Sequence, residues 1–123
     1  MRVHRIIPNL HVPDVGATAD FYAGYLGLSH EDLGLGWVTR YVASAAEDGA
    51  TAGAELQVVT RDGSAPQDAV ASVLVDDVDA AYDEARARGY EIVHPLTTEA
   101  WGVRRFFVRA PDGNVLNVAA HRR

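Results

Sequence analysis

Cysteine is absent from this chain of 123 residues, and lysine is absent too, since all 11 basic residues are arginine. Without cysteine the chain can form no disulfide, no thiolate nucleophile and no zinc–thiolate site. Any chemistry must therefore come from oxygen and nitrogen groups or from apolar contacts.

Long apolar runs and an excess of basic charge are missing as well. The longest apolar runs, such as the one from Val70 to Val75, fall far short of the roughly 20 residues that a membrane span needs. The net charge of −6 argues against attraction to nucleic acid or anionic lipid. The N-terminal residues show no apolar signal segment. We therefore expect a cytoplasmic protein with neither membrane nor nucleic acid as a partner.

What the chain does contain is the composition of one ordered domain. The hydrophobic fraction is 48% and the charged fraction 23%, close to the globular average. A chain of 123 residues is long enough for one core and too short for two. We predict a single domain over residues 1–123.

Periodicity predicts two helices. Apolar residues recur every three or four positions after Asp14 and again after Asp76 or Asp77, and these acids are natural N-caps. The first helix should end at Gly27 and the second at Gly89. Each helix follows a segment with the apolar character of a strand.

An internal repeat organises the chain. Val12–Val15 matches Val75–Val78 at an offset of 63 residues, and the two helix-ending glycines are 62 residues apart. The predicted strands of the first half are Ile6–Val12, Leu28–Leu33, Trp37–Ser44 and Ala54–Thr60. Those of the second half are Val70–Val75, Tyr90–His94, Gly102–Arg109 and Val115–His121. Turns are predicted at Ala46–Gly49, Arg61–Pro66 and Pro111–Asn114.

The predicted fold is α+β, with two βαβββ units over about residues 1–62 and 67–123. The units would form a cupped mixed sheet with the helices on its outer face. Because side chains alternate along a strand, each strand has a second, more polar face. Asn9 and His11 lie on that face of the first strand, Glu55 and Gln57 on that of the fourth, and Asn117 on that of the last. Such a mixed face is typical of a ligand cleft, although an ordinary solvated face is the alternative.

Several motifs resemble the vicinal oxygen chelate superfamily, which includes glyoxalase I, extradiol dioxygenases and bleomycin-resistance proteins. The matching segments span nearly the whole chain: Ile7–Val15, Asp20–Tyr22, Leu26–Leu28, Val75–Val78, Trp101–Phe106 and Pro111–Asn114. The resemblance implies the fold described above. It does not select one reaction, because this fold hosts several chemistries and some pure binders.

In metal-dependent members, the resemblance implies ligands at two positions in each half. Here those positions hold Ile7, Glu55, Val70 and Asn117, with Glu55 and Asn117 paired by an offset of 62 residues. Isoleucine and valine donate no electron pair to a metal. We therefore expect no metal and, without a GxGxxG or Walker loop, no other cofactor. A rearranged site with His11, Glu55 and Asn117 is an open alternative.

The aromatic residues suggest ligand contacts. Trp37 follows a glycine-rich turn and is in phase with Tyr41, and Trp101 is in phase with Phe107. Packing in the core is the alternative for each of them, and the dispersed histidines His4, His30, His94 and His121 are expected to be surface or capping residues. The predicted ligand-binding residues are Asn9, His11, Trp37, Tyr41, Glu55, Gln57, Trp101, Phe107 and Asn117, with no catalytic or metal-binding residue assigned.

The leading hypothesis is a metal-free binding protein closest to the bleomycin-resistance type. It would sequester a bulky, partly aromatic natural product or antibiotic and form a homodimer. One alternative is an enzyme of the same fold, a lyase, isomerase or dioxygenase-like protein that uses His11, Glu55 or an atypical metal site. The other is an accessory or regulatory interaction domain.

Overall fold

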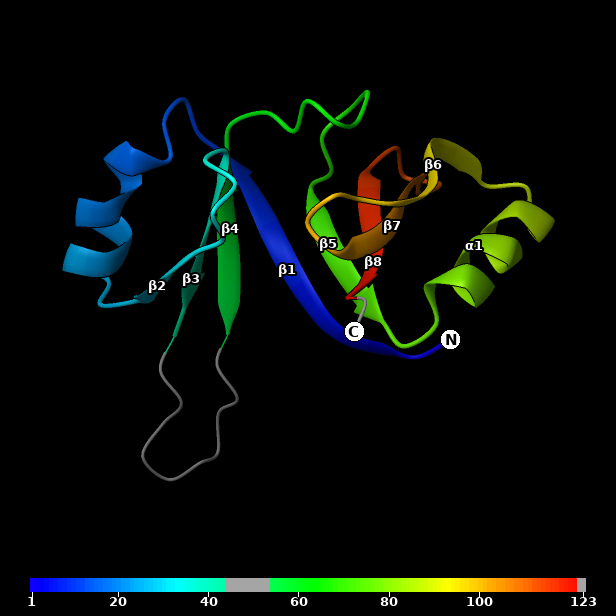
Figure 1. The fold of residues 1–123 in the computed structure, drawn as a ribbon, viewed down its shortest axis with the longest axis horizontal. Coiled ribbons are helices and arrows are strands. Elements are labelled where there is room, and N and C mark those ends of the chain that lie inside the picture. The colour runs from blue at the N-terminus through cyan, green and yellow to red at the C-terminus, as the bar shows by residue number, and fades with distance from the viewer. Residues whose placement is uncertain (44–53, 122–123) are drawn as a thin grey trace. The chain divides into compact units, whose positions relative to one another are not determined.

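The computed structural model in Figure 1 describes residues 1–43 and 54–121. The predicted turn Ala46–Gly49 lies outside the described residues. Contacts within the chain define two compact units. We call Pro8–Asp62 the first unit, and Met1–Ile7 together with Gly63–Arg123 the second unit. This division follows the predicted repeat, except that the N-terminal residues up to Ile7 belong with the second unit.

The strands form a mixed sheet of eight, which confirms the predicted α+β class. They are β1 (Val3–His11), β2 (Ser29–Asp32), β3 (Val38–Val42), β4 (Glu55–Val59), β5 (Ala71–Val75), β6 (Glu91–Thr98), β7 (Val103–Arg109) and β8 (Val115–His121). Their hydrogen-bonded order is β2-β3-β4-β1-β5-β8-β7-β6. β1 begins in the second unit and ends in the first.

Each unit repeats one pairing pattern. In the first unit β1 pairs with β4 in parallel, and β2, β3 and β4 are antiparallel neighbours. In the second unit β5 pairs with β8 in parallel, and β6, β7 and β8 are antiparallel neighbours. The predicted internal repeat is therefore present at the level of topology.

The helix of the second unit packs closely on its strands. Helix α1 (Val78–Ala87) contacts β6, β7 and β8, and its residues Val78, Ala81 and Ala85 are buried in one core cluster with Phe106 (Figure 1). Asp77 caps the helix, since its Oδ1 accepts a hydrogen bond from the Ala80 N–H at 3.0 Å. The predicted second helix is therefore confirmed together with its cap.

The helical segment of the first unit departs from the prediction of one regular helix. It consists of a 3₁₀ turn, η1 (Gly16–Thr18), and a π-helical segment, η2 (Asp20–Tyr25), neither of which has a buried residue. The Leu26 N–H bonds the Phe21 carbonyl, five residues back, at 2.9 Å. Glycines at positions 16 and 24 lower the helix propensity of this segment, whereas α1 contains no glycine.

Both helical segments end where predicted. Gly27 and Gly89 adopt φ values of 71° and 77°. Residues with a side chain are disfavoured in this left-handed region, so glycine terminates each helix and redirects the chain into the next strand.

Candidate functional site

A row of polar side chains crosses the strands of the first unit. The pairing sets Asn9 of β1 opposite Gln57 of β4, Gln57 opposite Arg40 of β3, and Arg40 opposite Glu31 of β2. Directly paired residues present their side chains on the same face of a sheet. Asn9 and Gln57 thus share one face, as predicted, and Arg40 joins them there.

Arg40 links this row to Glu55. Its Nε lies 3.7 Å from Oε1 of Glu55, and its Nη1 lies 3.5 Å from Oε2 of Glu31. The side chains of Arg40 and Glu55 are 14% and 11% exposed, so the pair is largely withdrawn from solvent. His11, two residues beyond Asn9 on β1, is exposed. The sequence prediction omitted Arg40, although its alternation with Tyr41 on the third strand was a usable signal.

Tyr41 was wrongly predicted to contact a ligand. It lies opposite Leu56 and is 1% exposed, so it points to the other face of the sheet. There its ring stacks on Tyr22 at 5.1 Å and its Oη lies 2.9 Å from Oγ1 of Thr18. Tyr41 therefore anchors the helical segment of the first unit. Trp37 precedes β3 and is half-buried, and its role as a ligand contact stays a prediction.

In the second unit, a tight turn between β6 and β7 presents Trp101. The Glu99 N–H bonds the Val103 carbonyl at 2.7 Å, and the Gly102 N–H bonds the Glu99 carbonyl at 3.1 Å. Gly102 has a φ of 93°, a conformation that favours glycine. Trp101 is 37% exposed at this turn, which is unusual for so large a ring.

A buried arginine backs the Trp101 ring. The Arg105 guanidinium carbon lies 5.2 Å from the ring centroid of Trp101 and 4.8 Å from that of Phe107. Arg105 is 3% exposed, and its Nη2 lies 2.6 Å from Oε2 of Glu99 and 2.7 Å from Oγ of Ser64. These contacts hold the guanidinium in place against the tryptophan.

His94 belongs to the same cluster, which contradicts the expectation that it is a surface or capping residue. It is 9% exposed, and its ring meets Phe107 edge-on with centroids 5.5 Å apart. Its Nε2 lies 3.6 Å from Oε2 of Glu99. No sequence signal identified His94, Glu99 and Arg105 as a group, because only the hairpin between β6 and β7 brings them together.

Phe107 was also wrongly predicted as a ligand contact. It is 2% exposed and packs with Ala65, Ala69 and Val115. Ala65 and Ala69 come from the segment that joins the two repeats, and that segment covers this part of the sheet. The phenyl ring therefore belongs to the core of the second unit.

Asn117 is the equivalent of Gln57 and not of Glu55. The structure pairs Asn9 with Gln57 in one repeat and Ser72 with Asn117 in the other, and Asn9 and Ser72 are 63 residues apart, the offset of the repeat. The sequence offset of 62 residues is thus not maintained to the last strands. Asn117 donates from Nδ2 to Oγ of Ser72 at 3.1 Å, and its buried Oδ1 has no hydrogen-bond partner within residues 1–43 and 54–121.

The family positions for metal ligands do not fit a divalent ion. Ile7 is 1% exposed in the core, and Val70, like Ile7, has no donor atom in its side chain. Glu55 is paired with Arg40 and Asn117 with Ser72. In the part of the chain that the structure describes, no group of three His, Asp or Glu side chains could hold a metal.

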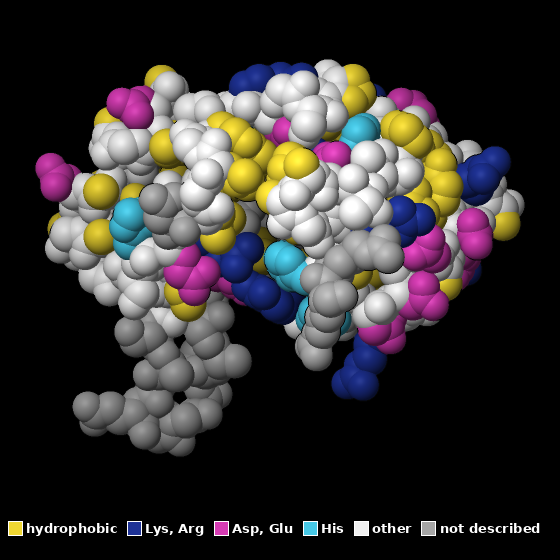
Figure 2. Space-filling model, in the orientation of Figure 1, with side chains coloured by type: hydrophobic (Ala, Val, Ile, Leu, Met, Phe, Trp, Pro, Cys, Tyr) yellow, Lys and Arg dark blue, Asp and Glu magenta, His cyan; other side chains and the backbone are white. Residues whose placement is uncertain are grey.

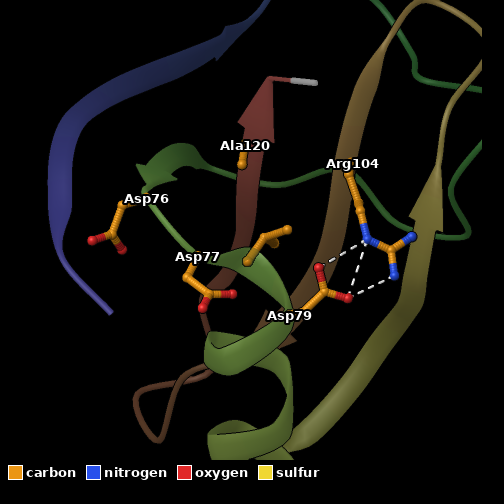
Figure 3. A pocket seen from close by; sticks show the side chains of 6 residues that line it. Asp76, Asp77, Asp79, Arg104 and Ala120 are labelled. Carbon is orange, nitrogen blue, oxygen red and sulfur yellow. Dashed lines mark hydrogen bonds and ion pairs between the residues drawn. The ribbon is translucent and has the colours of Figure 1, made fainter. Parts of the chain in front are cut away.

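An open pocket of about 410 Å³ lies at the start of α1 (Figure 3). Its lining includes Asp76, Asp77, Asp79 and Arg104. Asp77 caps the helix, and Asp79 accepts a 2.7 Å hydrogen bond from Nη2 of Arg104. Asp76 accepts a 2.7 Å bond from the backbone N–H of Arg2, and this bond is the main reason that its pKa is lowered. These acids thus have structural partners, as the interpretation of a capped helix start requires.

The repeated βαβββ topology defines a class of proteins, and the sequence matches one family within it. The model of the Glyoxalase/Bleomycin resistance protein/Dioxygenase superfamily matches residues 2–118. The chain therefore belongs to this superfamily. No curated protein matches the sequence.

Solved structures show the same fold at low sequence identity. One, described as an NAD-dependent benzaldehyde dehydrogenase from Legionella pneumophila, has 17% identity and a TM-score of 0.74 and covers 96% of this chain and 100% of its own. A superfamily member from Vibrio splendidus has 16% identity and a TM-score of 0.60, with coverages of 97% and 99%. A methylmalonyl-CoA epimerase variant from Streptomyces coelicolor, in complex with 2-nitronate-propionyl-CoA, has 19% identity and a TM-score of 0.66, with coverages of 98% and 96%. At these identities the likeness concerns the fold alone.

The surface view gives no sign of a single dominant charge. On the face shown in Figure 2, arginine side chains lie among acidic ones. Among the described residues, no helix has the length and apolar character to cross a membrane.

Proposed function

We propose that this chain is a small-molecule binding protein that works without a divalent metal and takes a planar or partly aromatic ligand. The observation that supports this best is the Trp101 ring, which is 37% exposed and backed by a guanidinium 5.2 Å from its centroid. The sequence prediction of Trp101 as a ligand contact is thus compatible with its position at the surface of the second unit. A self-resistance role, in which a natural product or antibiotic is sequestered, is the physiological form of this proposal.

Two physical arguments support a contact at Trp101. A large ring at a surface exposes apolar area, and stacking a planar ligand on it removes that area from water. The ring is also held in advance by Arg105, which Glu99 and Ser64 fix in turn. A contact that is already ordered loses less conformational entropy when the ligand binds.

The polar row of the first unit supports recognition by hydrogen bonds rather than by a metal. Its one carboxylate at a family ligand position, Glu55, is paired with Arg40. The amides of Asn9 and Gln57 can donate and accept hydrogen bonds. We propose that Asn9, His11, Glu55, Gln57 and Asn117 contact polar groups of the ligand.

The test replaces Trp101 with alanine and compares it with Tyr90→Ala. Tyr90 is a second aromatic residue of the second unit, 41% exposed, and serves as the matched control. Candidate aromatic antibiotics are screened by thermal shift and by quenching of tryptophan fluorescence. A ligand of the wild type should lose roughly 1–3 kcal/mol of binding free energy in Trp101→Ala and little in Tyr90→Ala.

The same titration can refute the proposal. If no aromatic compound in the screen quenches or stabilises the wild type, the accessory-domain hypothesis gains support instead. Chromatography of the ligand after incubation shows whether it is altered, which would favour the enzyme hypothesis.

Independence from metal is tested separately. Thermal melts with zinc, nickel, manganese and iron should leave the melting temperature of the wild type unchanged. A tightly bound ion at a hundredfold excess over its Kd would stabilise the fold by about 2.7 kcal/mol, which a melt detects. A rise in melting temperature that disappears in Glu55→Ala would contradict the proposal.

We also propose a homodimer. Exposed apolar side chains on η2 and just after it, including Phe21 at 54% and Tyr25 at 77%, leave surface available for a second copy. Sedimentation should give a mass near twice the 13.3 kDa of one chain. A monomer at micromolar concentration would contradict this assembly.

A further inference from the structure

Two buried ionisable side chains near Trp101 have no part in the proposed binding contact. His94 lies on β6, and Glu99 lies at the turn that follows this strand. Their side chains are 11% and 8% exposed. Ionisable groups that are largely withdrawn from water need a structural or functional explanation.

One oxygen atom of Glu99 is shared between two nitrogen-bearing side chains. Oε2 accepts a hydrogen bond from Nε of Arg105 at 2.8 Å and lies 2.6 Å from Nη2 of the same residue. Nε2 of His94 lies 3.6 Å from this oxygen, which is beyond hydrogen-bonding distance. Within the part of the chain that the structure describes, Nε2 of His94 has no hydrogen-bond partner.

The long distance is what an unprotonated Nε2 would give. A nitrogen lone pair and a carboxylate oxygen repel each other, whereas a protonated Nε2 donates a charge-assisted hydrogen bond of about 2.7–2.9 Å. Proton uptake would therefore draw the carboxylate of Glu99 towards His94. Because the same oxygen atom binds Arg105, this movement weakens the hold on the guanidinium that backs Trp101.

We infer that His94 and Glu99 are proton-linked positioning residues for Trp101. The inference rests on the proposed function for its consequence, which is that ligand binding at Trp101 depends on pH. The charged groups facing His94 are Glu99 from the turn and Arg105 from β7, while its ring also meets the uncharged Phe107. Glu99 favours the protonated imidazole and Arg105 opposes it.

The test needs no ligand, because tryptophan emission responds to a nearby guanidinium. The chain has two tryptophans, so Trp37→Phe leaves Trp101 as the sole emitter. Histidine ordinarily titrates between about pH 5 and pH 8. Over this range, the emission of Trp37→Phe should change in a transition of one proton. The transition should be lost when His94→Gln is added and kept when His4→Gln, an exposed histidine of the second unit, is added instead.

Two results would overturn the inference. One is a Trp37→Phe variant whose emission is constant over this pH range, and the other is a transition that survives His94→Gln. If His94→Gln fails to fold, proton NMR of Trp37→Phe replaces it: the His94 imidazole resonances must titrate with the midpoint of the emission, and resonances that do not move refute the inference. A failed ligand screen refutes the proposed function and leaves this titration unaffected.

Discussion

The helical segments of the two repeats occupy the same place in the topology and are held in different ways. Helix α1 buries Val78, Ala81 and Ala85 against its strands, whereas η1 and η2 bury no residue. The segment of the first unit is instead attached by the stack of Tyr22 on Tyr41 and by the contact between Thr18 and Tyr41. Close packing is thus one way to secure a crossover, and a few contacts with one buried ring are another.

The outward positions of the two helices differ in chemistry as well. Glu84 and Arg88 of the second repeat form an ion pair of 2.8 Å. At the repeat offset of 63 residues their equivalents are Phe21 and Tyr25, whose rings lie 5.4 Å apart. One helix therefore presents charge to solvent where the other presents aromatic rings. The difference indicates that only the first repeat has an outer face suited to contact with another molecule.

The largest expected effect separates the two kinds of attachment. Phe106 of β7 is 1% exposed and packs with α1, so Phe106→Ala should lower the free energy of unfolding by about 3–5 kcal/mol. Phe21→Ala on η2 removes the same side chain from a site that is 54% exposed, and it should cost less than about 1 kcal/mol. Urea melts of both variants measure the difference. Equal losses would show that η2 is packed as tightly as α1.

Helix capping should give a smaller contrast. Asp77→Ala removes the cap of α1 and should cost about 0.5–2 kcal/mol. Asp14, its equivalent in the first repeat, accepts a 2.9 Å bond from the Gly16 N–H, which belongs to a short 3₁₀ turn. Asp14→Ala should therefore destabilise the protein less than Asp77→Ala in the same melts. The reverse order would mean that the first helical segment depends more on its start than on Tyr41.

The smallest expected effect concerns Asp76, whose equivalent in the first repeat is Pro13. The backbone N–H of Arg2 is the main cause that lowers the pKa of Asp76 below its usual value of 3.8. A carboxyl with a lowered pKa in the folded state stabilises the fold above its unfolded pKa, and this contribution disappears as the pH falls through the folded value. Asp76→Asn should therefore reduce the loss of stability below about pH 4, measured by acid titration of the circular dichroism signal. Because Asp76 is exposed, the change should be slight, and an unchanged acid transition would assign the lowered pKa no role in stability.

The strand pattern could be predicted because alternation and turn residues act locally. All eight predicted strands are present, and Val115–His121 is found with the predicted bounds. Helix type in the first repeat could not be predicted in the same way. The apolar spacing after Asp14 fits an α-helix, but it does not show that a segment with two glycines has little to pack against.

The candidate site was predictable only where face and exposure follow from alternation. Asn9 and Gln57 share a face because β1 and β4 pair as expected. Phe107 has the correct phase, but Ala65 and Ala69 of the connecting segment cover it, and sequence alone does not show where such a segment packs. Arg105 resembles an exposed charge in the sequence, and its burial depends on Glu99 and Ser64 reaching it from elsewhere in the chain.

The parallel strand pairs also have a consequence for how the chain folds. Asn9 meets Gln57 and Ser72 meets Asn117 across separations of 48 and 45 residues, whereas β6, β7 and β8 are joined by short turns. Closing a long loop costs entropy before its contacts form, so distant pairings slow folding relative to local hairpins. We expect the β6-β7-β8 meander to form early and the parallel partners to join later. In refolding experiments, destabilising substitutions in the meander should then slow folding, while those in β1 and β5 should mainly accelerate unfolding.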